Sequence, residues 1–496
     1  MPGYKGSRIE TWRNPPARKY SVAVIGGGFS GATLAAQLLR HTGPSFSIVV
    51  IERTGLPGRG LAYGTESNAH LLNVAAKDMS AFPHDPEHFL RWAKSNFDCE
   101  TQPGSFLPRR VYGRYLGTLL SGTVLSDLPT RLQWIRDEAR AISQVGNGEI
   151  EIQLRSGARV LADKVVLALG NFPASDPCLP GRDAASRPHD LPQRYFSSPW
   201  SNPSFAGVEQ LDNVLLLGSG LTSMDVAVEL RRRGFTGTIH FLSRHGLLPR
   251  SHQTHAPWPV FWSERSPKSA RGLLRLVREQ VREARQQGID WRGVINSLRQ
   301  VTPQIWQSLP EMEKRRFLRH VRPYWEVHRH RAAPEVARLI ADEKSNRQIQ
   351  LHAGRITNYR EDGRAVEITY RERRRGEKRR LVVDRVINCT SPETDCRRLQ
   401  DALLSNLLAR GMVRPDPLFL GLDVSTEGAL IDQDGTASDS LYTVGPARKG
   451  GLWESTAVPE LRQQALKLVE HLVNTSLANL RNLVSMSAES ADNTNA

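Results

Sequence analysis

Three glycines and one acid near the start of the chain have the types and spacing of a dinucleotide-binding site. Gly26, Gly28 and Gly31 follow the apolar segment 21–25, and Glu52 lies 21 residues after the last glycine. In such a motif the glycines permit a tight turn, a close approach to a pyrophosphate and close helix packing. The helix N-terminus stabilises the phosphate charge, and the acid accepts hydrogen bonds from ribose hydroxyls. The set therefore predicts an adenosine ribose without a 2′-phosphate, as in FAD.

A second set of the same kind begins at Gly218. Gly218 and Gly220 follow an apolar run, and Ser223 replaces the third glycine with another small residue. Arg244 lies 21 residues after Ser223, at the offset that Glu52 has in the first set. A guanidinium at this position suits a 2′-phosphate, although a solvated surface arginine is the alternative. We therefore predict FAD at the first set and NADPH at the second, with NADH as a possible substitute.

Each set needs a buried strand, a tight turn and a helix to position it. The runs 21–25 and 47–51 are short and apolar, as in parallel strands, and 238–242 follows the second set in the same way. Asp163 and Asp384 each begin an Asp-x-Val-aliphatic pattern that follows alternating, strand-like residues. The expected order is a Rossmann unit, a β-meander, a second Rossmann unit, a second meander and a C-terminal return.

This order predicts an α/β fold with two Rossmann-like dinucleotide-binding domains, in which an NADPH domain with a helical insertion interrupts a discontinuous FAD domain. The expected boundaries are a disordered tail over 1–19, the FAD domain over 20–211 and 384–473, the NAD(P)H domain over 212–383, a basic helical insertion over about 258–345 and a flexible tail over 476–496.

The net charge of +16 is concentrated in one part of the chain. Residues 258–380 hold 29 Lys and Arg against 15 Asp and Glu, while the rest of the chain holds 38 against 36. The segment 371–380, RERRRGEKRR, lies between two strand patterns and is predicted to be a solvated hairpin tip. Because zinc-knuckle and RNP motifs are absent, a nucleic-acid partner is not expected. The excess charge fits attraction of anionic NADPH or substrate.

Composition and residue spacing narrow the possible location, metal ligands and partners of the protein. The four cysteines are too few and too scattered for a disulfide framework, which favours a cytoplasmic location. Histidines and cysteines do not occur at metal-ligand spacing, so we expect no metal site. Apolar runs are far shorter than the roughly 18 residues that span a membrane, so we expect no membrane partner. The oligomeric state is open.

Several longer stretches carry a resemblance to a known family. They are GRGLAYGT (58–65), HLLNVAAKDMSAFP (70–83), RRVYGRYL (109–116), SRHGLLPRSH (243–252) and GPARKGGLWESTAVPELRQQA (445–465). Together with the two nucleotide sets, these resemble the FAD/NAD(P)-binding flavoprotein monooxygenases that include bacterial FAD-dependent urate hydroxylases. N-hydroxylating monooxygenases are more distant relatives in this comparison. The resemblance covers about 20–473 and is specific for the family rather than for the substrate.

The resemblance also implies further FAD-binding residues. Asn73 and Met79 match positions that line the flavin, with an ordinary packed loop as the alternative. Relatives end their C-terminal strand with Gly-Asp, but here Gly445 is followed by Pro446, so the acid is missing. The backbone of Gly445 is still expected to approach the flavin.

The cofactor pair constrains the chemistry, because electrons from NADPH must leave the flavin. A paired-cysteine acceptor is absent from the sequence, so O2 is the expected acceptor, and substrate is hydroxylated through a flavin C4a-(hydro)peroxide. We therefore expect no obligatory catalytic side chain. Arg322, His328 and His330 could orient an anionic or carbonyl-rich substrate, hold NADPH phosphates, or dock the insertion. His252 and His255 are weaker candidates.

Four functions remain open from the sequence. Hydroxylation of urate to 5-hydroxyisourate, in purine metabolism, leads through the resemblance. N-hydroxylation of an amine or amino acid follows. An NADPH–flavin reductase that passes electrons to a partner, and a non-catalytic flavin-binding regulator that uses the basic insertion, are the other two.

Overall fold

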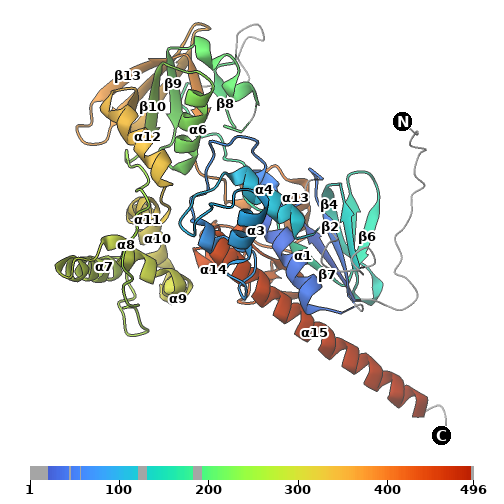
Figure 1. Cartoon of the computed structure of the whole chain (residues 1–496). Coiled ribbons are helices and arrows are strands. Elements are labelled where there is room, and N and C mark those ends of the chain that lie inside the picture. Colours follow the sequence, from blue (N-terminus) through green and yellow to red (C-terminus); the bar gives the residue numbers. More distant parts are fainter. Residues whose placement is uncertain are drawn as a thin grey trace.

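The computed structural model describes residues 20–43, 46–55, 57–120, 131–181, 193–200 and 202–492. Figure 1 shows a lower body, a second body above it, and a group of helices beside the two. The predicted disordered tail 1–19 lies outside the described residues. The predicted fold class is confirmed, because the described residues form two large sheets, each with a parallel core, and a small antiparallel one.

The first sheet has six strands and is parallel except at one edge, where β15 pairs antiparallel with β16. Hydrophobic residues are buried on both faces, as expected for a sheet covered on both sides. In spatial order the strands are β15 (Ala429–Ile431), β16 (Ala437–Thr443), β7 (Lys164–Leu167), β1 (Tyr20–Ile25), β2 (Phe46–Ile51) and β3 (Leu132–Ile135).

The second sheet has seven strands and belongs to the upper body in Figure 1. Its core is parallel, and a long strand, β11, continues into an antiparallel meander. In spatial order the strands are β13 (Lys378–Val383), β12 (Val366–Glu372), β11 (Ile349–Glu361), β10 (Thr238–Ser243), β9 (Asn213–Leu217), β14 (Arg385–Asn388) and β8 (Tyr195–Phe196).

The repeated Asp-x-Val pattern has the same structural role in both units. In the first unit the antiparallel sheet β4 (Ala139–Gln144), β5 (Ile150–Leu154) and β6 (Arg159–Ala162) leads into β7. Asp163 there accepts hydrogen bonds from the backbone and hydroxyl of Ser21, each 2.8 Å long, at the start of β1. Asp384 accepts from the backbone of Asp212 and Asn213 (2.9 and 2.8 Å) at the start of β9. Each aspartate fixes a returning strand beside the first strand of its own unit.

Two strands lie in a different sheet from the one implied by the predicted boundaries. The sequence predicts that residues up to 211 and from 384 belong to the FAD domain, but β8 and β14 pair with each other and β14 pairs with β9 in the second sheet. The reason is the repeat itself: β7 returns to β1, and β14 returns in the same way to β9. The second unit therefore begins before Tyr195 and extends through Asn388.

The two segments that connect the units run side by side. Ser175 Oγ donates to Glu393 Oε2 (2.7 Å), and Asn388 Nδ2 donates to the carbonyl of Ser175 (3.2 Å). The entering chain and the leaving chain are thus joined to each other between the two sheets.

The helices fall into three groups. Those of the first unit are α1 (Phe29–His41), α2 (Gly60–Tyr63), α3 (His88–Asn96), α4 (Arg109–Thr118), α13 (Ala402–Ala409), α14 (Lys449–Leu452) and α15 (Val458–Asp492). The second unit has α6 (Leu221–Arg232) and α12 (Pro334–Ser345). The insertion has α7 (Ala270–Gln286), α8 (Trp291–Ser297), α9 (Thr302–Ser308), α10 (Glu311–His320) and α11 (Arg322–Arg329).

The helical insertion ends earlier than the predicted residue 345. The helix α12 buries Val336 and Ile340 in the core of the second unit and connects the parallel strands β10 and β11. A parallel pair needs such a crossover helix, so α12 belongs to the Rossmann unit. The basic segment 371–380 forms the ends of β12 and β13 and the turn between them, as predicted.

The flexible tail predicted over 476–496 overlaps a helix, and 493–496 lie outside the described residues. Helix α15 continues to Asp492 and extends away from the body in Figure 1. The sequence after Pro459 contains neither glycine nor proline, so it offers no stop signal for a helix. Among the described residues, no helix is both long and apolar enough to cross a membrane.

Candidate functional site

The first glycine turn has the geometry that its sequence predicts. Gly26 has φ +103°, and a Cβ there would lie 2.4 Å from the carbonyl oxygen of Ala168, at the end of β7. A Cβ on Gly31 would lie 1.8 Å from the carbonyl oxygen of Gly26. The first glycine therefore allows the turn between β1 and α1, and the third allows α1 to pack on that turn.

Glu52 is held beside this turn at the end of β2. Its side chain is buried, and its Oε2 accepts a hydrogen bond from the backbone N–H of Gly27 (2.6 Å). Its Oε1 accepts from the backbone and the hydroxyl of Thr54, at 2.8 Å each. The carboxylate thus has a fixed orientation next to the glycines, as a group that selects a ribose would need.

Two other motifs meet the same turn. A Cβ on Gly28 would have only the Cα of Gly60 nearby, at 3.6 Å, so the backbone here is open to a ligand. Gly445 follows β16 with φ +98°, and a Cβ there would lie 2.8 Å from the hydroxyl of Ser30 in the first turn of α1. The structure therefore brings Gly445 and the 58–65 motif to the N-terminus of α1.

Asn73 and Met79 have different surroundings. The Met79 side chain is 1% exposed and packs inside the core of the first unit. Asn73 is partly exposed, and its carbonyl oxygen accepts a hydrogen bond from Nε2 of His252 (2.9 Å). Asn73 also lines a small pocket with Leu221, at the start of α6. Asn73 therefore lies where the first unit faces the second glycine turn, whereas Met79 lies within the core.

The second glycine turn repeats the first. Gly218 has φ +118°, and a Cβ there would lie 2.7 Å from the carbonyl oxygen of Cys389, at the end of β14. Gly220 precedes α6, and a Cβ there would meet nothing within 4 Å. Ser223 is fully buried in the first turn of that helix, at the place that Gly31 has in α1. A serine is thus small enough for this packing.

Arg244 follows β10 and is exposed. The loop beside it is fixed by Ser219, whose hydroxyl contacts Ser243 Oγ (2.8 Å) and donates to the carbonyl of Leu247 (2.6 Å). In the described part of the chain, Arg244 makes no ion pair. Its guanidinium is therefore accessible, and Arg244 has the same position after β10 that Glu52 has after β2 in the first unit.

The three substrate candidates lie on or just after α11 in the insertion, next to the loop that follows β10. Arg322 pairs with Glu326 (2.7 Å), and Nδ1 of His328 donates to the carbonyl of Tyr324 (2.7 Å). Burial lowers the pKa of His330. The contacts of Arg322 and His328 thus lie within α11 itself.

The docking surface of the insertion was not recognised in the sequence. Arg329 is buried and pairs with Glu460 (3.0 Å) and Glu454 (3.5 Å) of the C-terminal segment. Arg299 pairs with Glu460 as well. Trp306 stacks on Trp453, with ring centroids 5.0 Å apart. The only sequence signal was the crowding of aromatic and basic residues around 322–331.

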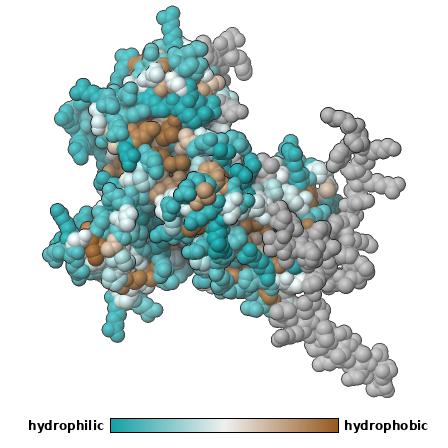
Figure 2. Space-filling view, viewed as in Figure 1, coloured by the Kyte–Doolittle hydropathy of each residue, from teal (hydrophilic) through white to brown (hydrophobic). Residues whose placement is uncertain are grey.

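A second missed feature joins the two nucleotide units. Arg109 Nη2 contacts Asp225 Oδ2 at 2.7 Å, and both side chains are largely buried. Ser67 donates to Glu229 Oε2 (2.7 Å) on the same helix, α6. Arg109, Ser67 and the start of the 70–83 motif thus lie on the face of the first unit that contacts α6. Figure 2 shows apolar surface in the hollow between the two bodies.

The histidines near this junction are held neutral. Burial, followed by the charges of Arg331, Arg292 and Arg329, lowers the pKa of His252 to about 4. Burial and the charge of Arg109 lower the pKa of His70 to about 4. His255 lies on the insertion side, where its Nε2 contacts the Asn296 side chain (2.9 Å). Among the described residues, no group of side chains could hold a metal ion.

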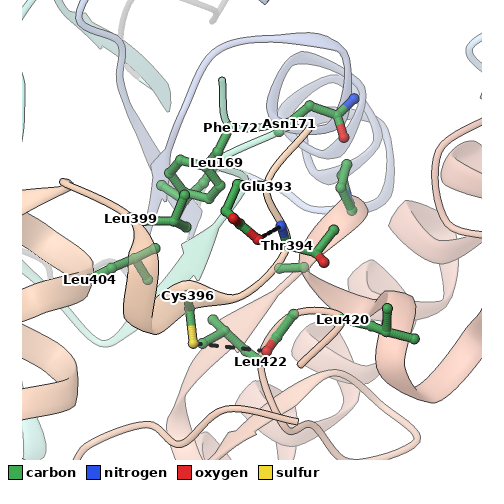
Figure 3. Close-up of a pocket in the computed structure, with 14 residues that line it drawn as sticks. Leu169, Asn171, Phe172, Glu393, Thr394, Cys396, Leu399, Leu404, Leu420 and Leu422 are labelled. Atoms are coloured by element: carbon green, nitrogen blue, oxygen red, sulfur yellow. Dashed lines mark hydrogen bonds between the residues drawn. The ribbon is translucent and has the colours of Figure 1, made fainter. Parts of the chain in front are cut away.

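Another pocket lies on the face of the first sheet opposite α1 (Figure 3). Leu169 and Phe172 line it from the end of β7, with Cys396 and Leu422 across from them. Cys396 contacts the carbonyl oxygen of Gly421 (3.9 Å). Gly170 and Pro446 also line it, so this largely apolar pocket adjoins the segments that end beside the first glycine turn.

Comparisons with known proteins agree with this geometry. Residues 23–172 match the model of a family described as FAD-NAD(P)-binding. No protein among those with curated functions matches the chain in sequence.

Among solved structures, the chain is similar to an L-lysine 6-monooxygenase from Pseudomonas syringae, with 18% identity, a TM-score of 0.61, and 91% of this chain and 99% of that chain covered. It is similar to the ornithine N-hydroxylase of Kutzneria sp. 744, solved with reduced FAD, NADP+ and L-ornithine (14%, 0.59, 92% and 100%). It is also similar to a cadaverine monooxygenase from Erwinia amylovora, solved with FAD (14%, 0.60, 91% and 94%). In fold, N-hydroxylating monooxygenases are therefore not distant, which corrects the ranking suggested by the sequence motifs.

Proposed function

We propose that the protein is an FAD- and NADPH-dependent monooxygenase that hydroxylates a nitrogen atom of a small amine or amino acid. The observation that carries the proposal is the pair of strand–glycine–helix turns, one followed by a fixed acid and the other by a free arginine. The fold likeness over nine-tenths of the chain to an ornithine N-hydroxylase solved with reduced FAD and NADP+ supports it.

The residues of the first turn fit FAD. Gly28 leaves the backbone open at the N-terminus of α1, where the helix favours a pyrophosphate. Glu52 would accept the ribose hydroxyls, and the backbone around Gly445 would approach the flavin end. Asn73 would lie on the side that faces the second unit.

The residues of the second turn fit NADPH in the same way. Gly220 is open at the N-terminus of α6, and Arg244 is free to bind a 2′-phosphate. When bound, NADPH would supply hydride, and reduced FAD would supply the electrons that activate O2.

The chain's own task is to bind, orient and exclude water. The contact of Arg109 with Asp225 fixes the first unit against α6, so that the two turns keep a constant separation. His252 donates a hydrogen bond to the carbonyl of Asn73 between them, and its lowered pKa keeps it neutral at physiological pH.

An amine substrate replaces urate as the leading proposal. The three solved enzymes named above act, by their names, on lysine, ornithine and cadaverine. A reductase that passes electrons through a protein dithiol is disfavoured, because all four cysteines are described and none is paired.

The test is oxygen uptake by the purified, FAD-loaded protein with NADPH and a panel of ornithine, lysine, cadaverine and urate. We expect one amine to accelerate uptake and to yield a hydroxylamine product detected by mass spectrometry. Acceleration by urate alone would restore the earlier proposal, and hydrogen peroxide without any hydroxylated product would refute a monooxygenase for this panel.

A pair of variants tests the FAD assignment separately. Glu52→Ala should lower the ratio of flavin to protein, whereas Glu87→Ala, an exposed acid before α3, should not. Equal flavin content in both variants would remove Glu52 from the site.

A further inference from the structure

Three arginines from separate segments of the second unit meet at the end of β10. Arg244 follows Ser243, which pairs with Ala353 on β11. Arg355 lies two residues beyond Ala353, and the backbone N–H of Arg373 donates to the carbonyl of Ala353 (2.9 Å). A β-strand, its neighbour and the following hairpin thus carry Arg244, Arg355 and Arg373 to one corner.

These arginines are exposed and unpaired within the described residues. The nearby acids of the hairpin have other partners: Arg379 contacts Glu377 (2.8 Å) and Glu372 (3.5 Å), while Arg380 contacts Glu367 (2.5 Å). Three positive charges therefore share the corner without a counter-charge.

The pKa of His245 depends on the charges of all three arginines, so His245 lies close to each of them. Burial, followed by the charges of Arg373, Arg244 and Arg355, lowers the pKa of His245. Its Nδ1 is buried and has no hydrogen-bond partner among the described residues. The ring of Tyr324 closes the other side, with centroids 6.1 Å apart. The three arginines thus lie around a neutral imidazole, and the ring of Tyr324 packs on the other side of that imidazole.

We propose that Arg355 and Arg373 join Arg244 in binding a phosphate monoester, the 2′-phosphate of NADPH. This inference rests on the proposed function and names two residues that the Rossmann motif does not contain. A phosphate monoester carries close to two negative charges, so one guanidinium does not neutralise it. The planar guanidinium of arginine can donate two parallel hydrogen bonds to phosphate oxygens. The corner lies beside the loop of Ser219, next to the open backbone of Gly220, where the rest of the dinucleotide would lie.

The alternative is that Arg355 and Arg373 are solvated surface residues without a ligand, like other arginines of the hairpin. Arg375 is the matched comparison: it is an exposed arginine in the same turn, two residues from Arg373. Any general effect of removing a charge from the hairpin would appear equally in Arg375→Ala.

The experiment is calorimetric titration of the FAD-loaded protein with 2′-AMP and with 5′-AMP. For 2′-AMP, Arg355→Ala and Arg373→Ala should each raise the dissociation constant by roughly tenfold or more, as expected for one lost charge-assisted bond to phosphate. Arg375→Ala should change it less than about twofold, as expected for a screened surface charge. Binding of 5′-AMP should change little in all three variants.

The outcomes separate this inference from the function. If 2′-AMP binds the unsubstituted protein and the Arg355 and Arg373 variants equally well, the inference is wrong while an NADPH enzyme remains. If Arg375→Ala weakens binding as much as the other two, the effect is general charge and the inference also fails. If the unsubstituted protein binds neither 2′-AMP nor NADPH, the NADPH assignment itself fails. Far-ultraviolet circular dichroism and flavin content establish that each variant is folded.

Discussion

Removal of the Arg109 side chain should destabilise the contact between the two nucleotide units. Arg109 donates to Asp225 (2.7 Å) and to the carbonyl of Leu71 (3.1 Å). The exposed fractions of the two charged side chains are 18% and 8%, so Arg109→Ala leaves a buried carboxylate without its partner. The loss should therefore exceed that of an ordinary surface ion pair.

The magnitude follows from the geometry. Two unit charges 2.7 Å apart attract by about 6 kcal/mol at an effective dielectric constant of about 20, before desolvation is subtracted. Removing one partner of a buried pair costs roughly 3–5 kcal/mol. Because Arg109 retains some exposure, we expect Arg109→Ala to lower the free energy of unfolding by about 3 kcal/mol, the lower end of this range. Arg114→Ala, an exposed arginine on the same helix, should cost less than about 0.5 kcal/mol.

The assay is urea unfolding of both variants as a function of pH, with flavin content measured in parallel. Burial raises the pKa of Asp225, and Arg109 opposes this rise. Without Arg109 the pKa rises further, so the folded variant takes up a proton more readily and its deficit should shrink as the pH falls toward the raised pKa of Asp225.

A double-variant cycle with Asp225→Asn checks the pairing. The double variant should be more stable than Arg109→Ala alone, because no charge is left buried. An Arg109→Ala deficit below about 1 kcal/mol, or one that does not depend on pH, would refute the reasoning.

Three further predictions concern the first turn, a histidine and the insertion. Gly31→Ala should lower the unfolding temperature more than Gly28→Ala, because the added Cβ would lie 1.8 Å rather than 3.6 Å from its nearest neighbour; equal effects by scanning fluorimetry would contradict this. The free energy of unfolding should fall as pH drops from 6.5 to about 4, because unfolding frees His252 to bind a proton that its folded environment disfavours. His252→Gln should reduce this slope in urea titrations, and an unchanged slope would count against the buried, neutral form. Trp306→Ala should remove the stack on Trp453 and speed hydrogen exchange in α7 to α10 but not in the sheets; protection unchanged throughout would show that the stack does not hold the insertion.

The turns could be predicted from sequence because their determinants are local. Gly26, Gly31 and Gly218 act within a few residues of the strand and helix that they join, and the spacing to Glu52 follows from one βαβ unit. The sheets follow from short apolar runs for the same reason.

Contacts between segments that are far apart in the sequence, by contrast, have no local sequence pattern from which they could be predicted. Arg109 and Asp225 are 116 residues apart, and either could have been a solvated helix residue. The burial of Met79 depends on packing that its own segment does not determine. The placement of β14, by contrast, was available from the repeat, because Asp384 repeats the role of Asp163.

The paired connection between the units makes the second unit an exchangeable module. Its first strand, β8, and its last strand, β14, are hydrogen-bonded neighbours, and Ser175 and Glu393 join the chains outside them. Splicing a different nicotinamide-binding domain between these two residues would open no gap in the first sheet, whose strands all lie outside the exchanged segment. Such a chimaera would have to reproduce the acids on α6 that meet the first unit, the hydrogen bond of His252 to Asn73 and the contacts of the insertion with the C-terminal segment, so cofactor preference could be changed by transplantation rather than residue by residue.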